Sequence, residues 1–213
     1  MKCYQIAPET LQMQYLCSDC KDTGYIENEK CHCLRQRIID EMYQQSNLRE
    51  ILKAENFSTL SYRYYDQENM EKMQVAIETC TKFSENFDKT FENILLCGTV
   101  GTGKTFLSNC IAKEVLDKGH SVLYLSAFQL FDLMAKNSFS GNAPKEDFVA
   151  KQYPHIFESD LLIIDEMGYV SFDRFQSELL FKVIADRSER GSVIVTPNLP
   201  FSEWTTLFEN TAL

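Results

Sequence analysis

Residues 98–105 read Gly98-Thr99-Val100-Gly101-Thr102-Gly103-Lys104-Thr105 and fit the phosphate-loop pattern G-x-x-x-x-G-K-[ST] at every fixed position. Residues 93–97 predict a short buried strand before the loop, and residues 106–118 predict a helix after it. Glycines let backbone N–H groups close around phosphate oxygens, where the helix N-terminus adds partial positive charge. Lys104 can then reach the β- and γ-phosphates, and Thr105 can ligate Mg²⁺. The whole stretch therefore predicts an ATP site; the alternative is a glycine-rich turn with a chance lysine.

An apolar run over residues 161–164 ends in two acids, Asp165 and Glu166. Such a run suits a parallel strand that is buried on both faces, and doubly wound sheets place ligand chemistry at the carboxyl ends of their strands. We expect Asp165 to hold Mg²⁺, directly or through water, and Glu166 to orient and deprotonate the attacking water. The alternative is a strand that ends in a solvated acidic turn.

Another apolar stretch, residues 192–196, ends at Pro197 and Asn198. An amide at this strand end could hold the attacking water or the γ-phosphate beside the two acids. The sequence Thr-Pro-Asn is also good turn chemistry, and the residues alone favour the turn.

The alternation of strand and helix patterns predicts an α/β fold, with a parallel sheet of about four strands and helices on both faces. Gly119 and Gly191 punctuate helix ends before strands, as C-terminal caps do. The expected strands are 93–97, 121–125, 161–165 and 192–196, and the expected helices are 68–90, 104–118, 127–136, about 146–157, 173–189 and a tail from Ser202.

Length and composition limit the class of protein. The chain has 213 residues, of which 44% are hydrophobic and 24% charged, which fits one soluble medium-sized domain with a small appendage. No apolar run approaches the length of a membrane span, and the N-terminus lacks the features of a signal peptide, so we expect a cytoplasmic protein with no membrane partner. The net charge of −10 argues against broad, non-specific coating of DNA.

The eight cysteines of such a protein are not expected to form a disulfide framework. Cys17 and Cys20 make one close pair, Cys31 and Cys33 make another, and a short hairpin between them could close a tetrahedral Zn²⁺ site. His32 ranks fifth as a ligand, because neighbouring residues rarely all fit one metal. The alternatives are reduced thiols or a redox C-x-x-C pair. Outside this group we expect three core thiols, Cys80, Cys97 and Cys110.

A helix is expected from residue 34 to about residue 53, with a break near Asn47. The aromatic, turn-prone tract 55–65 follows, and its aromatic side chains either anchor the linker to the core or cover the adenine; the anchor is the simpler interpretation. We therefore divide the chain into a zinc-binding module with a linker helix, residues 1–56, and an ATP-binding domain, residues 57–213.

In these residues and motifs, the chain resembles the AAA+ ATPases of the DnaC/DnaI helicase-loader and IstB transposition-helper group. Residues 17–26 (CSDCKDTGYI) with 31–33 (CHC) look like the zinc module of DnaI-type loaders. Residues 86–131 look DnaC-like, and the stretch from 164 (IDEMGY) to 204 (FSEW) is more similar to IstB.

The resemblance implies further roles. It makes Asn198 the sensor residue, although Pro197 stands where such chains usually carry a small hydroxyl residue. It places an extra helix for single-stranded DNA within residues 127–158, for which a solvated helical hairpin is the alternative. The basic residues there are Lys136, Lys145 and Lys151.

Family members continue past the Trp204 region into a helix that carries an arginine acting on a neighbour's ATP, and then a fifth strand. Arg187 and Arg190 do not match that arginine's position. The resemblance therefore suggests a fragment or a natural truncation with weak ATPase activity. It also makes the first strand an exposed edge, which invites self-association.

The function that the resemblance implies is an ATP-driven accessory factor in DNA replication. It would bind ATP, Mg²⁺, Zn²⁺ and single-stranded DNA to load or remodel a replicative DNA helicase, with the zinc module contacting the helicase. One alternative is a transposition helper that binds duplex DNA and recruits a transposase. A second is a nucleotide-binding adaptor with little turnover.

Overall fold

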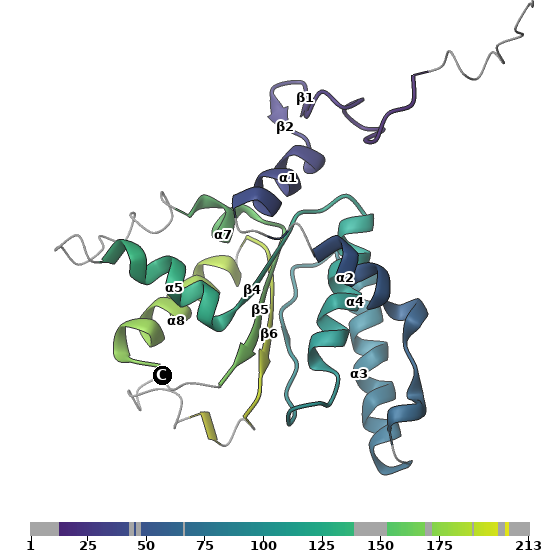
Figure 1. Cartoon of the computed structure of the whole chain (residues 1–213), viewed down its shortest axis with the longest axis vertical. Helices are drawn as coiled ribbons and strands as arrows, with labels where there is room; N and C mark the ends of the chain where they lie inside the picture. Colours follow the sequence, from purple (N-terminus) through teal and green to yellow (C-terminus); the bar gives the residue numbers. More distant parts are fainter. Residues whose placement is uncertain are drawn as a thin grey trace, which may run out of the picture.

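A computed structural model describes residues 13–42, 45, 48–65, 67–138, 153–168, 172–188, 190–199 and 203–204. Four parallel strands form the central sheet in the order β3-β6-β5-β4 (Figure 1). Their bounds are β3 Ile94–Leu95, β4 Val122–Ser126, β5 Leu161–Met167 and β6 Ser192–Pro197. The predicted α/β fold with about four parallel strands is confirmed. Within the described residues β3 lies at one edge of the sheet and β4 at the other.

Helices cover both faces of the sheet. The helices α2 (Leu48–Ala54), α3 (Gln67–Asn86) and α4 (Lys104–Asp117) lie on one side, and α5 (Ala127–Ser138), α7 (Pro154–Glu158) and α8 (Arg174–Ser188) lie on the other (Figure 1). Alternate residues of β5 divide between these layers, because successive strand side chains point to opposite faces. Leu161 and Ile163 pack with α3 and α4, whereas Leu162 and Ile164 pack with α5 and α8. This two-sided burial explains why the strand is apolar throughout.

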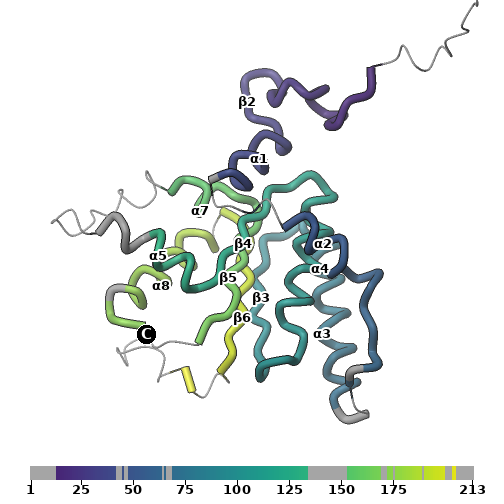
Figure 2. The backbone as a smooth tube through the Cα atoms, in the orientation of Figure 1, coloured from purple at the N-terminus to yellow at the C-terminus, as the bar shows by residue number. Residues whose placement is uncertain are grey.

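The cysteine module precedes this body. A short antiparallel hairpin, β1 (Tyr25–Ile26) and β2 (Glu29–Lys30), leads into helix α1 (His32–Met42). Figure 2 shows the hairpin beyond one end of the sheet, above α1. The helix that we expected over residues 34–53 is thus two helices, α1 and α2, with the predicted break between them. Two short 3₁₀ turns, η2 (Phe57–Thr59) and η3 (Tyr62–Tyr64), then lead to α3.

One sequence-based expectation is wrong, and others fall partly or wholly on residues outside the described part of the chain. Cys80 and Cys110 are fully buried, but the prediction of a core thiol at Cys97 is wrong, since this residue is exposed on the extended segment after the edge strand β3. The structure describes only Pro154–Glu158 of the expected helix 146–157. Residues 145 and 151, the side chain of residue 136 and the tail after residue 204 lie outside the described part. No helix that the structure describes combines the length and apolarity of a membrane span.

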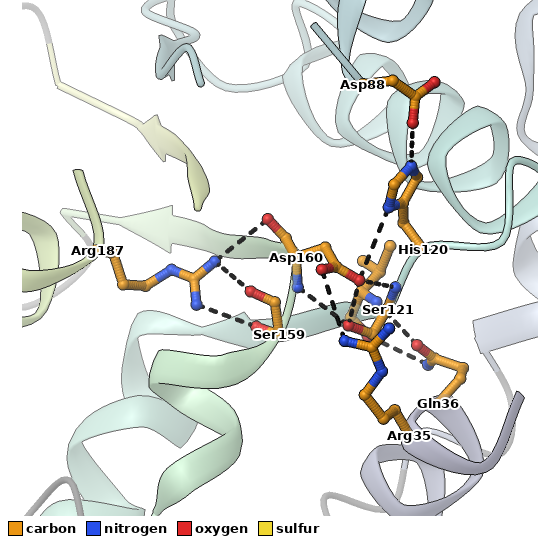
Figure 3. Close-up of polar contacts among 9 residues, drawn as sticks. Arg35, Gln36, Asp88, His120, Ser121, Ser159, Asp160 and Arg187 are labelled. Atoms are coloured by element: carbon orange, nitrogen blue, oxygen red, sulfur yellow. Dashed lines mark hydrogen bonds and ion pairs between the residues drawn. The ribbon is translucent and has the colours of Figure 1, made fainter. Parts of the chain in front are cut away.

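A polar cluster closes the amino ends of the strands (Figure 3). Arg187 is 1% exposed and donates to backbone oxygens of Ile156 and Ser159, each at 2.7 Å. Burial lowers the pKa of Arg187 to about 10. Nearby, the Asp160 carboxylate accepts hydrogen bonds from the Ser121 backbone N–H and hydroxyl, both at 2.7 Å. Arg187 is therefore a structural residue, enclosed too fully to act on a neighbouring subunit's ATP.

Two glutamines cover the free edge of β4, where an edge strand would leave backbone groups unpaired. The Gln36 amide donates to Val122 O at 3.2 Å, and Val122 N–H donates back to Gln36 Oε1 at 2.8 Å. Gln45 makes the same reciprocal pair with Tyr124, whose N–H donates to Gln45 Oε1 at 3.3 Å. Both glutamines are buried, at 3% and 8% exposed. The segment after the cysteines is therefore joined to the sheet by a side-chain substitute for a neighbouring strand.

We expect Gln36→Ala to lower the free energy of unfolding by about 1–3 kcal/mol, because it leaves the buried N–H and C=O of Val122 without partners. Arg37→Ala, at an exposed position of the same helix, is the matched control and should change it by less than about 0.5 kcal/mol. Urea denaturation of the purified variants measures both. Equal stability of the two variants would show that water replaces the glutamine amide at no cost.

Candidate functional site

The phosphate loop joins β3 to α4 and has the backbone that its glycines allow. Gly101 and Gly103 have φ angles of 81° and 91°, which L side chains rarely adopt. Gly103 is the N-cap residue of α4, so the helix begins directly at Lys104. The free N–H groups of this first turn point toward the loop, the arrangement that favours phosphate oxygens.

Lys104 is folded back onto its own loop. Its ammonium donates to the backbone oxygens of Gly98 and Thr99 at 2.7 and 2.8 Å, and the residue is only 8% exposed. Burial lowers the pKa of Lys104, and the negative charge of Asp165 opposes that effect. Because the loop carbonyls hold the cation by exchangeable hydrogen bonds, an incoming phosphate can take their place.

Asp165 joins the loop to the sheet. Its Oδ1 accepts hydrogen bonds from the Thr105 hydroxyl at 3.4 Å and from Glu166 N–H at 2.9 Å, and also from the Thr196 hydroxyl. Its Oδ2 accepts from the Tyr124 hydroxyl at 2.7 Å. The structure thus brings the predicted pair Thr105 and Asp165 together.

Tyr124 and Thr196 were not predicted as site residues. They lie on β4 and β6, the two strands that flank β5. The signal available in the sequence is weak: a hydroxyl-bearing residue in each of two mainly apolar strands, each of which also carries a serine at one end. Burial, followed by the charge of Asp165, raises the pKa of Tyr124, so its hydroxyl stays protonated and donates to the carboxylate.

Glu166 owes its position to an irregularity in the sheet. The register between β5 and β6 shifts between Ile164 and Met167, and Glu166 has a left-handed φ of 60°. Its backbone N–H is held by Asp165 and by the Thr196 hydroxyl, the latter at 3.1 Å. The carboxylate is therefore exposed, while its neighbours in the strand are buried. Such strained backbone occurs preferentially at functional sites.

Asn198 follows the end of β6, and its backbone N–H donates to Met167 O at 2.7 Å. Its side-chain Nδ2 is buried and has no hydrogen-bond partner among the described residues. The amide lines a cavity of about 400 Å³ together with Lys104, Thr105 and Glu166. The structure therefore brings Asn198 and the phosphate loop to one cavity.

A second cavity, of about 640 Å³, lies along β3 and α3 and shares Gly101 and Lys104 with the first. Tyr65 lines it, and the Tyr65 hydroxyl donates to Thr102 O at 3.4 Å. Phe57, Leu60 and Tyr65 also pack against the core on this side of the sheet, in agreement with the interpretation that the aromatic tract anchors the linker.

The four clustered cysteines meet as predicted. The Sγ atoms of Cys17, Cys20, Cys31 and Cys33 all lie within 4.8 Å of one another. The Cys17–Cys31 pair is 3.8 Å apart and the Cys20–Cys33 pair 3.4 Å apart. A tetrahedral site with Zn–S bonds of about 2.3 Å separates its sulfurs by about 3.8 Å, so these residues fit zinc. His32 Nε2 stands beside the group, 3.5 Å from Cys17 Sγ.

Comparison with known proteins assigns the chain to a family. The family profile described as "IstB-like ATP binding protein" matches residues 24–213. The chain belongs to this family. It is an ATP-binding protein of the AAA+ group that includes the DnaC and IstB proteins.

Among curated relatives of this IstB-like protein, the putative ATP-binding protein of insertion sequence IS5376 from Geobacillus stearothermophilus is 29% identical over 83% of the chain and 80% of the relative. The IS21 putative ATP-binding protein of Pseudomonas aeruginosa is 31% identical over 57% of the chain and 44% of the relative. The replicative helicase loader DnaC of Escherichia coli K12 is 25% identical over 68% and 56%. The matches to these last two thus span about half of each relative.

Solved structures agree on the fold. The crystal structure of DnaI has a TM-score of 0.58 at 21% identity, over 75% of this chain and 80% of that one. AMPPCP-bound DnaA from Aquifex aeolicus has a TM-score of 0.54 at 18% identity, over 72% and 47%. At these identities the likeness establishes the AAA+ fold of the IstB-like chain and nothing further.

Proposed function

We propose that this protein is an ATP-driven accessory factor that binds Mg²⁺ and ATP, and that loads or remodels a replicative DNA helicase on single-stranded DNA. The observation that carries the proposal is the cavity in which Lys104 and Thr105 of the phosphate loop face Glu166 and Asn198. The phosphate loop contributes Lys104 and Thr105 to this cavity, and the ends of two strands contribute the exposed Glu166 and Asn198.

In the proposed site, the backbone of residues 98–105 surrounds the phosphates and Lys104 exchanges its loop carbonyls for phosphate oxygens. The Thr105 hydroxyl and the Asp165 carboxylate would hold Mg²⁺, which supplies neutralising charge for the phosphates. Tyr124 and Thr196 fix the position of the Asp165 carboxylate by donating hydrogen bonds to it. The family supports the nucleotide, while the individual roles are our proposal.

Glu166 is the proposed base. Its carboxylate takes a proton from a water, the water oxygen bonds to the γ-phosphorus, and the bond from that phosphorus to the ADP oxygen breaks. Asn198 donates its free amide to the water or to the γ-phosphate. The bulge in β5 supports this assignment, because it exposes Glu166 to the cavity while Asp165 stays buried.

The front of the chain, residues 1–56, is proposed as a Zn²⁺ module with its linker. Two short strands bury too little apolar surface to hold such a unit together, and metal binding would supply the missing stability. The four-thiol cluster favours the helicase-loader interpretation, since the resemblance of this module is to DnaI-type loaders.

A second candidate is a transposition helper that recruits a transposase. The relatives favour this candidate: proteins named for insertion sequences match at up to 34% identity or over up to 83% of the chain, whereas DnaC is 25% identical. The exposed edge strand β3 is consistent with self-association in either candidate.

Washed, metal-replete protein should contain about one zinc per chain, the content of a single four-thiolate site. The double variant Cys17→Ser plus Cys20→Ser should lose that zinc, whereas Cys80→Ser, which changes a buried cysteine outside the cluster, should retain it. Elemental analysis measures both. Undiminished zinc in the double variant would place the metal elsewhere.

Glu166→Gln should keep its affinity for ATP but lower hydrolysis about 10²–10⁴-fold, because it removes the proposed base and leaves the phosphate loop intact. Asp165→Asn should instead raise the Mg²⁺ concentration that nucleotide binding requires. Equilibrium titration with a fluorescent ATP analogue and steady-state turnover separate the two effects. Loss of ATP affinity in a folded Glu166→Gln protein would mean that the two roles are misassigned.

Lys104→Ala should sharply weaken binding of the fluorescent analogue, with an unchanged circular dichroism spectrum, because the phosphates lose their principal cation. The wild type, immobilised with Mg²⁺ and a non-hydrolysable ATP analogue, should capture the replicative helicase of its source organism and not the transposase, and Lys104→Ala should capture less. Capture of the transposase alone would select the second candidate. Equal nucleotide affinity in Lys104→Ala would contradict the ATP site itself.

A further inference from the structure

The linker between the cysteine module and the ATP-binding body contributes an acid to the phosphate cavity. Glu55 follows directly after helix α2, which runs beside α4 (Figure 2). It lines the cavity of about 400 Å³ that also contains Thr105, Glu166 and Asn198. No sequence pattern identified Glu55 as a site residue.

The Glu55 side chain is held at one oxygen and free at the other. The Asn109 amide, 4% exposed on α4, donates to Glu55 Oε2 at 2.6 Å. Leu52, three residues earlier, is 1% exposed and packs in the core beside α4, which fixes the backbone that carries the acid. Glu55 Oε1 has no hydrogen-bond partner within the described part of the chain. The carboxylate is therefore positioned rather than loosely solvated, and it keeps one acceptor available to the cavity.

Three carboxylates, those of Glu55, Asp165 and Glu166, contribute negative charge to the region around Tyr124. The pKa of Tyr124 is raised by burial first and by Asp165 next, with further contributions from Glu55 and Glu166. Lys104 is the cation that lines the cavity with Glu55 and Glu166. Three negative charges near the phosphate subsite repel a polyphosphate and attract a divalent cation.

We propose that Glu55 is a positioning residue for Mg²⁺, whose free oxygen accepts a hydrogen bond from a water of the metal's shell. This inference rests on the proposed ATP–Mg²⁺ function of the same site. Mg²⁺ usually keeps several of its waters in proteins, so an acid that lies beyond direct contact can still orient it. Glu55 makes nucleotide binding depend on the cation more strongly than Thr105 and Asp165 alone would.

The test compares wild type, Glu55→Gln and Glu50→Gln. Gln keeps the shape of Glu55 and can still accept the hydrogen bond from Asn109, so only the charge is removed. Glu50 lies on helix α2, which ends just before Glu55; its side chain is 72% exposed and its carboxylate is bonded to Lys53 at 2.6 Å, which makes it the matched control. Binding of a fluorescent ATP analogue is measured against Mg²⁺ concentration and again in excess EDTA.

Glu55→Gln should raise the half-saturating Mg²⁺ concentration about 3- to 10-fold, the effect of one partly screened charge. In EDTA it should bind the analogue more tightly than wild type, because a repulsive charge is gone. Glu50→Gln should match wild type in both assays. A second variant, Glu55→Ala, should shift both measurements in the same directions as Glu55→Gln.

The assignment is overturned if both Glu55 variants give the Mg²⁺ titration and the EDTA affinity of wild type, even where their melting temperature falls. In that case Glu55 serves only as a structural partner of Asn109. A failure of the proposed ATP–Mg²⁺ function would give a different result. In that case Mg²⁺ would not promote binding of the analogue to wild type, or Lys104→Ala would bind the analogue as well as wild type does.

Discussion

The hydrogen bonds to Asp165 are the interaction on which the rest of the site depends. This one carboxylate belongs to a residue that is 5% exposed, and it accepts hydrogen bonds from Thr105 of the phosphate loop, from Tyr124 on β4 and from Thr196 on β6. A buried charge is costly unless it is satisfied, and these donors satisfy it. The same contacts fix the relative positions of three strands and the loop. Displacement of any one of these elements would remove a donor from this buried acid, so the hydrogen bonds hold the loop and the strand ends in one arrangement.

The bulge in β5 separates the tasks of two adjacent acids. In a regular strand Glu166 would point to the face opposite Asp165, into a helix layer that is apolar. The register shift and the left-handed φ at Glu166 instead turn it out of the strand, and the Thr196 hydroxyl holds its N–H there. The Asp165 carboxylate remains buried and hydrogen-bonded to its donors, while Glu166 is exposed to the cavity. Two chemically similar residues thereby acquire different environments.

The front module and the ATP-binding body are joined more closely than their sequence boundary suggests. Gln36 and Gln45 pair with the backbone of β4, and Arg35 lies 3.9 Å from Asp160 at the amino ends of the strands (Figure 3). The segment then continues to Glu55 in the phosphate cavity. A single stretch of chain thus runs from the thiol cluster past the edge of the sheet to the nucleotide site. A change in the position of the module would therefore displace β4, and with it Tyr124 and its hydrogen bond to Asp165.

The sequence by itself determined what local patterns can encode. The glycine spacing specified the phosphate loop, apolar runs and helical periodicity specified the order of strands and helices, and two close cysteine pairs specified the thiol cluster. These features depend on backbone preferences and on residues near one another in the chain. The tertiary structure decided the rest: the glutamine pairs across β4, the Tyr124 and Thr196 bonds to Asp165, the burial of Arg187, the exposure of Cys97 and the presence of Glu55 in the cavity. For example, Gln36 and Val122 are 86 residues apart in the sequence, and no local pattern predicts their hydrogen bonds. Contacts of this kind depend on strand register and helix docking, which are set by the packing of the whole chain rather than by any one segment.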